Sequence, residues 1–273
     1  MSGLPSKPKS KKEPLLTPRN IRKAREVTQE NYLIKALLVG PSGGGKSTFA
    51  ATIPGNSLVL DCDLRSESLV GLPGVEIFEI GEPDTDNPTA FDRLCQIKDE
   101  LWDLAKSPDG LPYDTIIVDG YTRLGRYAMY KALQLTDSRG QKMATMPGGG
   151  PAQPHYSPQM TWVVNFSMQM LPLPCNVIFT GHVDIYEDKH LQSIHFYPKI
   201  TGKIRTEVSS WFNETYLCEY KKEYLIHTLP QGRYDFLKSS LNTRGKYWES
   251  PRTVDLDKNP CGFAELLDLR FKK

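Results

Sequence analysis

Nine consecutive residues near the start of the chain have the composition of a loop that binds phosphate groups. Residues 40–48 read Gly-Pro-Ser-Gly-Gly-Gly-Lys-Ser-Thr and match the pattern GxxxxGK[ST] at every position. The glycines allow backbone N–H groups to converge on an anion, and a following helix adds the partial positive charge of its N-terminus. In such a P-loop, Lys46 reaches the β- and γ-phosphates and the Ser47 hydroxyl is a ligand of Mg²⁺. The pattern therefore predicts a nucleotide site held by Gly40, Pro41, Ser42, Gly43, Gly44, Gly45, Lys46, Ser47 and Thr48.

A carboxylate for the same metal ion is expected at the end of a neighbouring strand. Thr115-Ile116-Ile117-Val118 has the composition of a buried strand, and it ends in Asp119. The carboxyl ends of parallel strands meet at one edge of a sheet, so Asp119 is expected to share Mg²⁺ with Ser47. The expected nucleotide is ATP, because the chain has no Asn-Lys-x-Asp motif of the kind with which GTPases read guanine.

The elements that must position these groups follow from hydrophobic periodicity. Buried strands are predicted at residues 33–39, 57–60, 75–80, 115–118 and 177–180, and helices at residues 47–53, 91–104, 124–135 and 158–171. Strands at 215–219 and 224–227 are joined so tightly that they predict an antiparallel hairpin. The expected fold is therefore α/β, a mostly parallel central sheet flanked by helices, with a C-terminal antiparallel hairpin.

Two irregular stretches interrupt this alternation. Residues 140–158 contain four glycines and four prolines, which predicts a mobile loop. Residues 182–211 mix polar and alternating apolar positions, which predicts a hairpin or a loop.

Charge divides the chain into two parts. The 34 Lys and Arg against 32 Asp and Glu give a net charge of +2, but residues 1–30 hold eight basic and three acidic residues, so residues 31–273 sum to −3. Residues 1–30 also carry four prolines and few large apolar side chains. We expect a disordered basic arm at 1–30 and one domain at 31–273. The arm either follows nucleic-acid phosphates or serves as a solubilising tail.

Cysteine spacing and hydropathy restrict the class of protein further. The five cysteines are scattered without a CxxC pair or Cys/His cluster, which favours free thiols in a reducing compartment over a disulfide scaffold or a zinc site. No apolar run approaches the roughly 18–20 residues that span a bilayer, and no secretory signal begins the chain. A cytoplasmic protein without a membrane partner is expected.

Beyond these two motifs, further segments resemble the RecA-like ATPase core, and within it the small phage-encoded P-loop proteins of the single-strand annealing ATPase type. The likeness covers about Leu33 to Trp248 and includes Leu-Val-Leu-Asp-Cys-Asp at 58–63, Asn-Val-Ile-Phe-Thr-Gly-His at 176–182 and Asn-Thr-Arg-Gly-Lys at 242–246. It implies a RecA-like P-loop ATPase that uses ATP and Mg²⁺ and acts on single-stranded DNA in annealing or recombination. It also implies a homo-oligomer, a single-strand binding protein as a further partner, and the host cytoplasm as the location of a phage-encoded protein.

The resemblance implies catalytic roles for Lys46, Asp63, Asp119 and His182. In RecA-like proteins a glutamate at the position of Asp63 activates the attacking water, and aspartate is one methylene shorter. Hydrolysis is therefore expected to be slow, or Glu67 substitutes; Asp63 as a turn cap is the alternative. His182 follows a buried strand and would sense the γ-phosphate, or it is a hydrogen-bonded loop histidine.

Two further groups of residues follow from the same resemblance. Arg244 and Lys246 would reach the nucleotide of a neighbouring subunit as fingers in trans, or they form a solvated basic turn. Arg139, Lys142 and Tyr156 flank the 140–158 loop and would contact DNA through charge and stacking, unless the loop is simply mobile.

Two other functions remain open at this point. A nucleotide-gated assembly or binding module with little turnover is favoured by Asp63 and by the basic arm. A small-molecule or nucleotide kinase would need an arginine-bearing lid, and the candidate lid at 140–158 has only Arg139 beside it.

Overall fold

The chain divides into two units, Met1–Tyr32 and Leu33–Lys273. A mixed sheet of buried strands forms the centre of the second unit. The computed structural model describes residues 32–188, 193–230, 232–240, 251–255 and 258–271. The strand order is β11-β9-β8-β1-β5-β4-β2-β3, and β10 pairs with β8. The strands that pair in parallel are β1 (Lys35–Val39), β2 (Ser57–Asp61), β3 (Val75–Glu79), β4 (Thr115–Asp119), β5 (Asn176–Gly181) and β8 (Glu214–Lys221).

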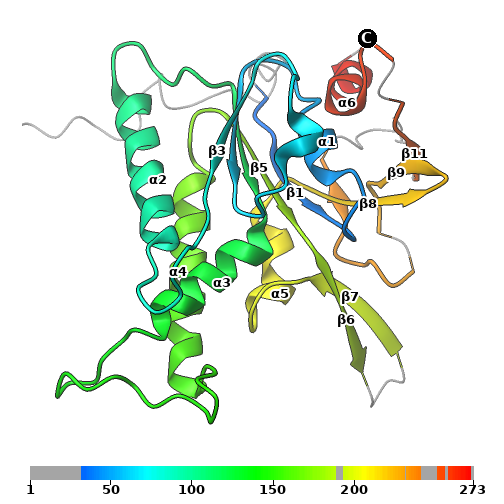
Figure 1. Ribbon diagram of the computed structural model, residues 1–273. Helices are drawn as coiled ribbons and strands as arrows, with labels where there is room; N and C mark the ends of the chain where they lie inside the picture. Colours follow the sequence, from blue (N-terminus) through cyan, green and yellow to red (C-terminus); the bar gives the residue numbers. More distant parts are fainter. Residues whose placement is uncertain (1–31, 189–192, 231, 241–250, 256–257, 272–273) are drawn as a thin grey trace, which may run out of the picture. The chain divides into compact units, whose positions relative to one another are not determined.

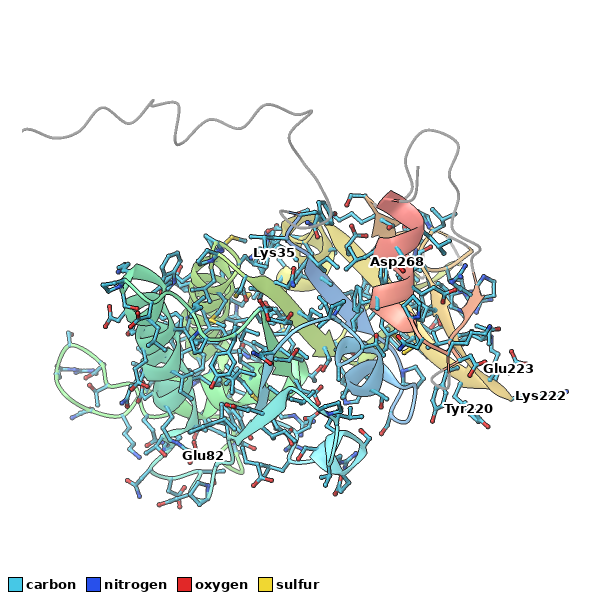
Figure 2. All side chains as sticks on the ribbon, turned by 90° about the horizontal axis from the view of Figure 1, so that it is seen from above. Lys35, Glu82, Tyr220, Lys222, Glu223 and Asp268 are labelled. Carbon is cyan, nitrogen blue, oxygen red and sulfur yellow. The ribbon has the colours of Figure 1, made fainter. Side chains whose placement is uncertain are left out.

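An antiparallel extension completes one side of the sheet. It consists of β9 (Glu223–His227), β10 (Lys238–Ser239) and β11 (Arg252–Thr253). The predicted C-terminal hairpin is confirmed as β8–β9, and the turn is made at Lys222, whose φ is +66°. Figure 2 shows Tyr220, Lys222 and Glu223 together at the tip of this hairpin.

Helices cover both faces of the sheet (Figure 1). They are α1 (Lys46–Ala50), α2 (Ala90–Lys106), α3 (Tyr121–Ala132), α4 (Gln153–Met170), α5 (Ile204–Glu207) and α6 (Gly262–Phe271), with 3₁₀ turns η3 (Ser66–Leu69) and η4 (Val208–Trp211). Alternate residues of the strands, such as Leu37 and Phe179, pack against α2, α3 and α4. On the other face Phe49 of α1 stacks on Phe263 of α6, with ring centroids 4.5 Å apart. The predicted α/β class, a P-loop NTPase fold with a mostly parallel sheet between helices, is confirmed.

Strand register brings chemically important residues to the same end of the sheet. Asp119 of β4 is paired with Thr180 of β5 on one side and with Asp61 of β2 on the other. Val39, the last residue of β1, is paired with Gly181 of β5, so the P-loop begins beside the end of β5. Because β5 lies between β1 and β4, the P-loop that follows β1 and Asp119 at the end of β4 lie at the same edge of the sheet.

The stretch predicted as a loop at residues 140–158 is only partly irregular. The loop prediction is wrong for residues 153–157, because α4 begins at Gln153 and not at the predicted helix start, residue 158. Pro154 lies in the first helical turn, where no N–H is needed, and His155 Nδ1 accepts the N–H of Ala152 at 3.0 Å. Pro158 costs the helix one backbone hydrogen bond without ending it.

Residues 182–211 were expected to form a hairpin or a loop, and they contain a hairpin. Its strands are β6 (Val183–Asp188) and β7 (Ser193–Pro198), and Figure 1 shows them leaving the main sheet beyond β5. The C-terminal helix α6 was not predicted. In the described ranges no helix is both long enough and apolar enough to cross a membrane.

Candidate functional site

The P-loop packs closely against the neighbouring strand β8, and this close packing requires glycine at two of its positions. A Cβ atom on Gly40 would lie 2.0 Å from the carbonyl oxygen of Cys218, and one on Gly44 would lie 2.6 Å from the same oxygen. Both distances are far shorter than any real contact, so a side chain at either position would push the loop off the sheet. The loop is thus held at the end of β1, and α1 starts within it at Lys46.

Ser47 and Asp119, the two predicted ligands of Mg²⁺, lie side by side. The Ser47 hydroxyl donates a hydrogen bond to Asp119 Oδ2 at 2.7 Å. The other carboxylate oxygen, Oδ1, accepts a hydrogen bond from the hydroxyl of Thr180. Burial raises the pKa of Asp119, and the bonds from Thr180 and Ser47 oppose that shift. A hydroxyl and a carboxylate this close supply the oxygen ligands that Mg²⁺ prefers.

Lys46 is folded back over the P-loop. Its ammonium group donates to the carbonyl oxygens of Pro41 at 2.7 Å and Gly40 at 3.3 Å. Burial lowers the pKa of Lys46, and the nearby carboxylates of Asp119 and Asp63 act in the opposite direction. The ammonium group therefore lies where an anion entering the loop would meet it.

Asp63 lies between the side chains of Arg123 and His182. Its Oδ1 is 3.6 Å from Arg123 Nε, and its Oδ2 is 3.8 Å from His182 Nε2. Burial lowers the pKa of His182, helped by the Lys46 ammonium and opposed by Asp63. This favours the neutral imidazole, while Arg123 supplies the permanent positive charge beside Asp63.

The structure separates the alternatives that the sequence left open for this segment. The turn after β2 is capped by Asp61, whose carboxylate oxygens accept the N–H groups of Leu64 at 2.8 Å and Arg65 at 3.0 Å. Asp63 therefore does not serve as the cap of this turn. Asp63 lines the P-loop pocket, whereas Glu67 lies exposed on η3 and is absent from the residues that line it within the described ranges.

A pocket of about 260 Å³ contains most of the predicted site. Its predicted members are Ser42, Gly43, Gly45, Lys46, Ser47, Thr48, Asp63, Asp119 and His182, and it also takes in Arg65, Ser68 and Tyr224. The structure thus brings together the loop, the carboxylate and the two catalytic candidates from four separate segments of the chain.

Besides Arg65 and Ser68, three residues of this region were not predicted from the sequence. Thr180 lies in the segment 176–182, which the resemblance already included. Its hydroxyl near the end of a buried strand could have indicated a site residue. Arg123 lies four residues after Asp119, one turn into α3, and nothing in its neighbourhood indicated a partner. Tyr224 comes from the β9 strand, and its ring lies against the P-loop, since a Cβ on Gly45 would be 2.8 Å from Tyr224 Cδ1.

The predicted DNA-contacting residues lie elsewhere. Arg139 is 3.3 Å from Asp137, and Lys142 donates to Gln134 Oε1 at 2.7 Å, both within the loop before α4. Tyr156 lies in the first turns of α4 and is half-buried. None of the three lines the P-loop pocket in the described part of the chain. Arg244 and Lys246, the predicted fingers, lie outside the described residues.

Comparisons with known proteins agree with this geometry. A family model described as an AAA domain matches residues 33–261, which include the P-loop, Asp63, Asp119 and His182. No curated protein matches the chain.

Proposed function

The chain belongs to the AAA domain family, and from this premise we propose that it is a Mg²⁺-dependent ATPase that acts on single-stranded DNA in annealing or recombination. Nucleotide binding and a P-loop ATPase core follow from the family. The proposal adds three points to this: dependence on Mg²⁺, action on single-stranded DNA, and a role in annealing or recombination.

The residues fit ATP and Mg²⁺. The glycines let the loop pack closely on β8, several loop residues line the pocket, and Lys46 and the start of α1 add positive charge. Ser47 and Asp119 would hold the metal ion through oxygen atoms. Bound Mg²⁺-ATP would supply the phosphoryl group and neutralise its charge.

The observation that carries hydrolysis is the position of Asp63. Its carboxylate lines the same pocket as Lys46 and Asp119, and it is one of the few acidic groups there. Arg123 Nε lies 3.6 Å from this carboxylate, and a carboxylate can orient water or accept a proton from it. Asp63 is therefore the general-base candidate, and Arg123 is its positioning residue.

Support for single-stranded DNA comes from the β6–β7 hairpin. On one face of it the rings of Tyr186 and Tyr197 lie 6.2 Å apart, and the Arg205 guanidinium lies 4.7 Å from the Tyr186 centroid. Tyr186 is exposed and Tyr197 is half-buried, and aromatic rings beside a cation can stack bases while the cation neutralises phosphates. The hairpin follows directly after His182, which lines the P-loop pocket.

A second candidate function is a nucleotide-gated module with little turnover. Asp63 is one methylene shorter than glutamate, and its Oδ1 lies 3.6 Å from Arg123 Nε. A shorter carboxylate held beside a cation would orient water poorly, so nucleotide would be retained.

The test is ATP turnover and DNA binding by the full chain, with and without single-stranded DNA, in wild type, Lys46→Ala and Asp63→Asn. We expect Lys46→Ala to lose ATP binding and Asp63→Asn to bind ATP but turn over at least about tenfold less. Lys106→Ala, an exposed helix position, is the control for loss of a lysine.

Each outcome separates the candidates. Turnover stimulated by DNA supports the ATPase, and tight retention of ATP without turnover supports the gated module. Phosphate transfer to a nucleoside would support a kinase instead. DNA binding that never depends on nucleotide would overturn the proposal. Size-exclusion chromatography of the wild type tests the homo-oligomer that the resemblance implies, and ATP turnover of Arg244→Ala tests its finger in trans.

A further inference from the structure

A second pocket of about 280 Å³ lies beside the first and is nearly equal to it in volume. It is formed by α3, by Gln159 of α4, by Asp184 of β6 and by the residues that follow β7. None of the roles assigned above uses it.

A buried side chain with an unsatisfied oxygen is among the residues that line this pocket. Gln159 is 1% exposed, and its Nε2 donates to the carbonyl of Gly125 at 2.7 Å and to Thr201 Oγ1 at 2.8 Å. A carbonyl can only accept, so the Gly125 bond determines which end of the amide is nitrogen. Gln159 Oε1 accepts no hydrogen bond from any residue that the structure describes. A buried acceptor left in this way favours a ligand that brings an N–H or O–H donor.

The remaining lining has two chemical characters. Arg126 and Lys199 are exposed cations against the single carboxylate of Asp184, and neither cation has an ion-pair partner within the described ranges. Met129 and Ile200 add apolar surface. The pocket therefore suits a ligand with an anionic group, a flat or apolar body and a hydrogen-bond donor.

We propose that this second pocket binds one nucleotide unit, with its phosphate at Arg126 and Lys199, its base against Met129 and Ile200, and a base N–H donated to Gln159 Oε1. The unit comes either from a free mononucleotide or from a single strand of DNA. Only the second source rests on the function proposed above.

His182 joins the second pocket to the P-loop pocket. Its imidazole lines the P-loop pocket, while its backbone N–H donates to Thr122 Oγ1 at 3.2 Å and its carbonyl accepts the N–H of Lys199 at 2.7 Å. Thr122 and Lys199 both line the second pocket. Occupation of one pocket is therefore expected to change the affinity of the other, and the effect must be reciprocal.

The experiment measures binding of two probes, deoxyadenosine monophosphate and a short single-stranded oligonucleotide. Monophosphate binding is measured with the full chain carrying Lys46→Ala, so that the P-loop does not contribute. Oligonucleotide binding is measured with Lys46 intact and saturating ATP, because DNA binding is proposed to depend on nucleotide. In each background we compare Arg126→Gln, Lys199→Gln, Gln159→Met and the control Lys106→Gln.

Arg126→Gln and Lys199→Gln are each expected to lower the affinity for the probe that uses the pocket about two- to fivefold. For the oligonucleotide each should also reduce the slope of log affinity against log salt by about 0.7. Gln159→Met should weaken binding without changing that slope, and Lys106→Gln should change neither.

The two probes distinguish the sources. Loss of monophosphate binding supports a free nucleotide, and loss confined to the oligonucleotide supports a strand. If the Arg126→Gln, Lys199→Gln double variant binds both probes like its parent, the proposal is overturned. These surface substitutions do not depend on whether Gln159→Met folds. ATP turnover of the same variants with Lys46 intact reports separately on the P-loop.

Discussion

The hydroxyl of Thr180 donates a hydrogen bond to the carboxylate of Asp119, and its oxygen accepts the backbone N–H of Gly120 at 3.0 Å. The two residues are direct partners in the register of β4 and β5. One side chain thus holds both the proposed metal ligand and the turn that follows it.

Thr180→Val is expected to weaken the proposed Mg²⁺ site and the fold together. Valine keeps the shape but leaves Asp119 with one donor fewer, which costs about 1–3 kcal/mol of unfolding free energy. The pKa of Asp119, already raised by burial, should rise further because the Thr180 bond opposes that shift. Urea unfolding and the Mg²⁺ dependence of ATP binding measure the two effects. Thr180→Ser retains the hydroxyl and should behave nearly as wild type.

Gly120→Ala is expected to disturb Asp63. Gly120 has φ +99°, and a Cβ there would lie 2.9 Å from Asp63 Cγ. Gly110→Ala is the matched control, since Gly110 has φ +72° with no atom within 4 Å of the added Cβ. Both variants should lose about 1 kcal/mol of stability through backbone strain, but only Gly120→Ala should also lower ATP turnover. Equal turnover in the two variants would contradict the role given to Asp63.

Lys35 is expected to make stability depend on pH in the alkaline range. Burial lowers its pKa from 10.5 to about 8, while its ammonium donates to the carbonyls of Leu173 and Cys175 at 2.8 and 2.6 Å. Between these two pKa values the unfolded chain binds more protons than the folded chain, so this residue adds stability as the pH rises. Unfolding free energies from pH 7 to pH 10 should therefore rise for wild type relative to Lys35→Met. A constant difference would show that Lys35 keeps its ordinary pKa.

The cysteines are expected to react with iodoacetamide in two groups. Cys62, Cys175 and Cys218 are buried, and burial raises the pKa of Cys175 to about 11 and that of Cys218 to about 12. Cys95 and Cys261 are only half-buried. Mass spectrometry of the native protein should find label on the second pair first, because alkylation needs an accessible thiolate. Early labelling of Cys218 would mean that β8 separates from the P-loop, which packs on the carbonyl of that residue.

Much of the fold could be predicted from local patterns. The apolar runs that end in Val39, Asp61 and Asp119 are strands at those positions, because a buried parallel strand needs nearly continuous apolar residues. Element ends were less predictable. The start of α4 at Gln153 was missed because prolines that break a helix in its interior are tolerated in its first turn.

By itself the sequence determined the phosphate-binding loop, the strand that ends in Asp119 and the α/β class. These depend on residues that are adjacent in the chain, and on short-range sterics and periodicity. Only the tertiary structure decided that Thr180 meets Asp119, that Arg123 and His182 flank Asp63, and that Gln159, with a buried unsatisfied oxygen, lines a second pocket. The Thr180–Asp119 contact joins positions 61 residues apart. Such contacts depend on strand order and register, which result from packing of the whole domain and are not encoded in any single segment.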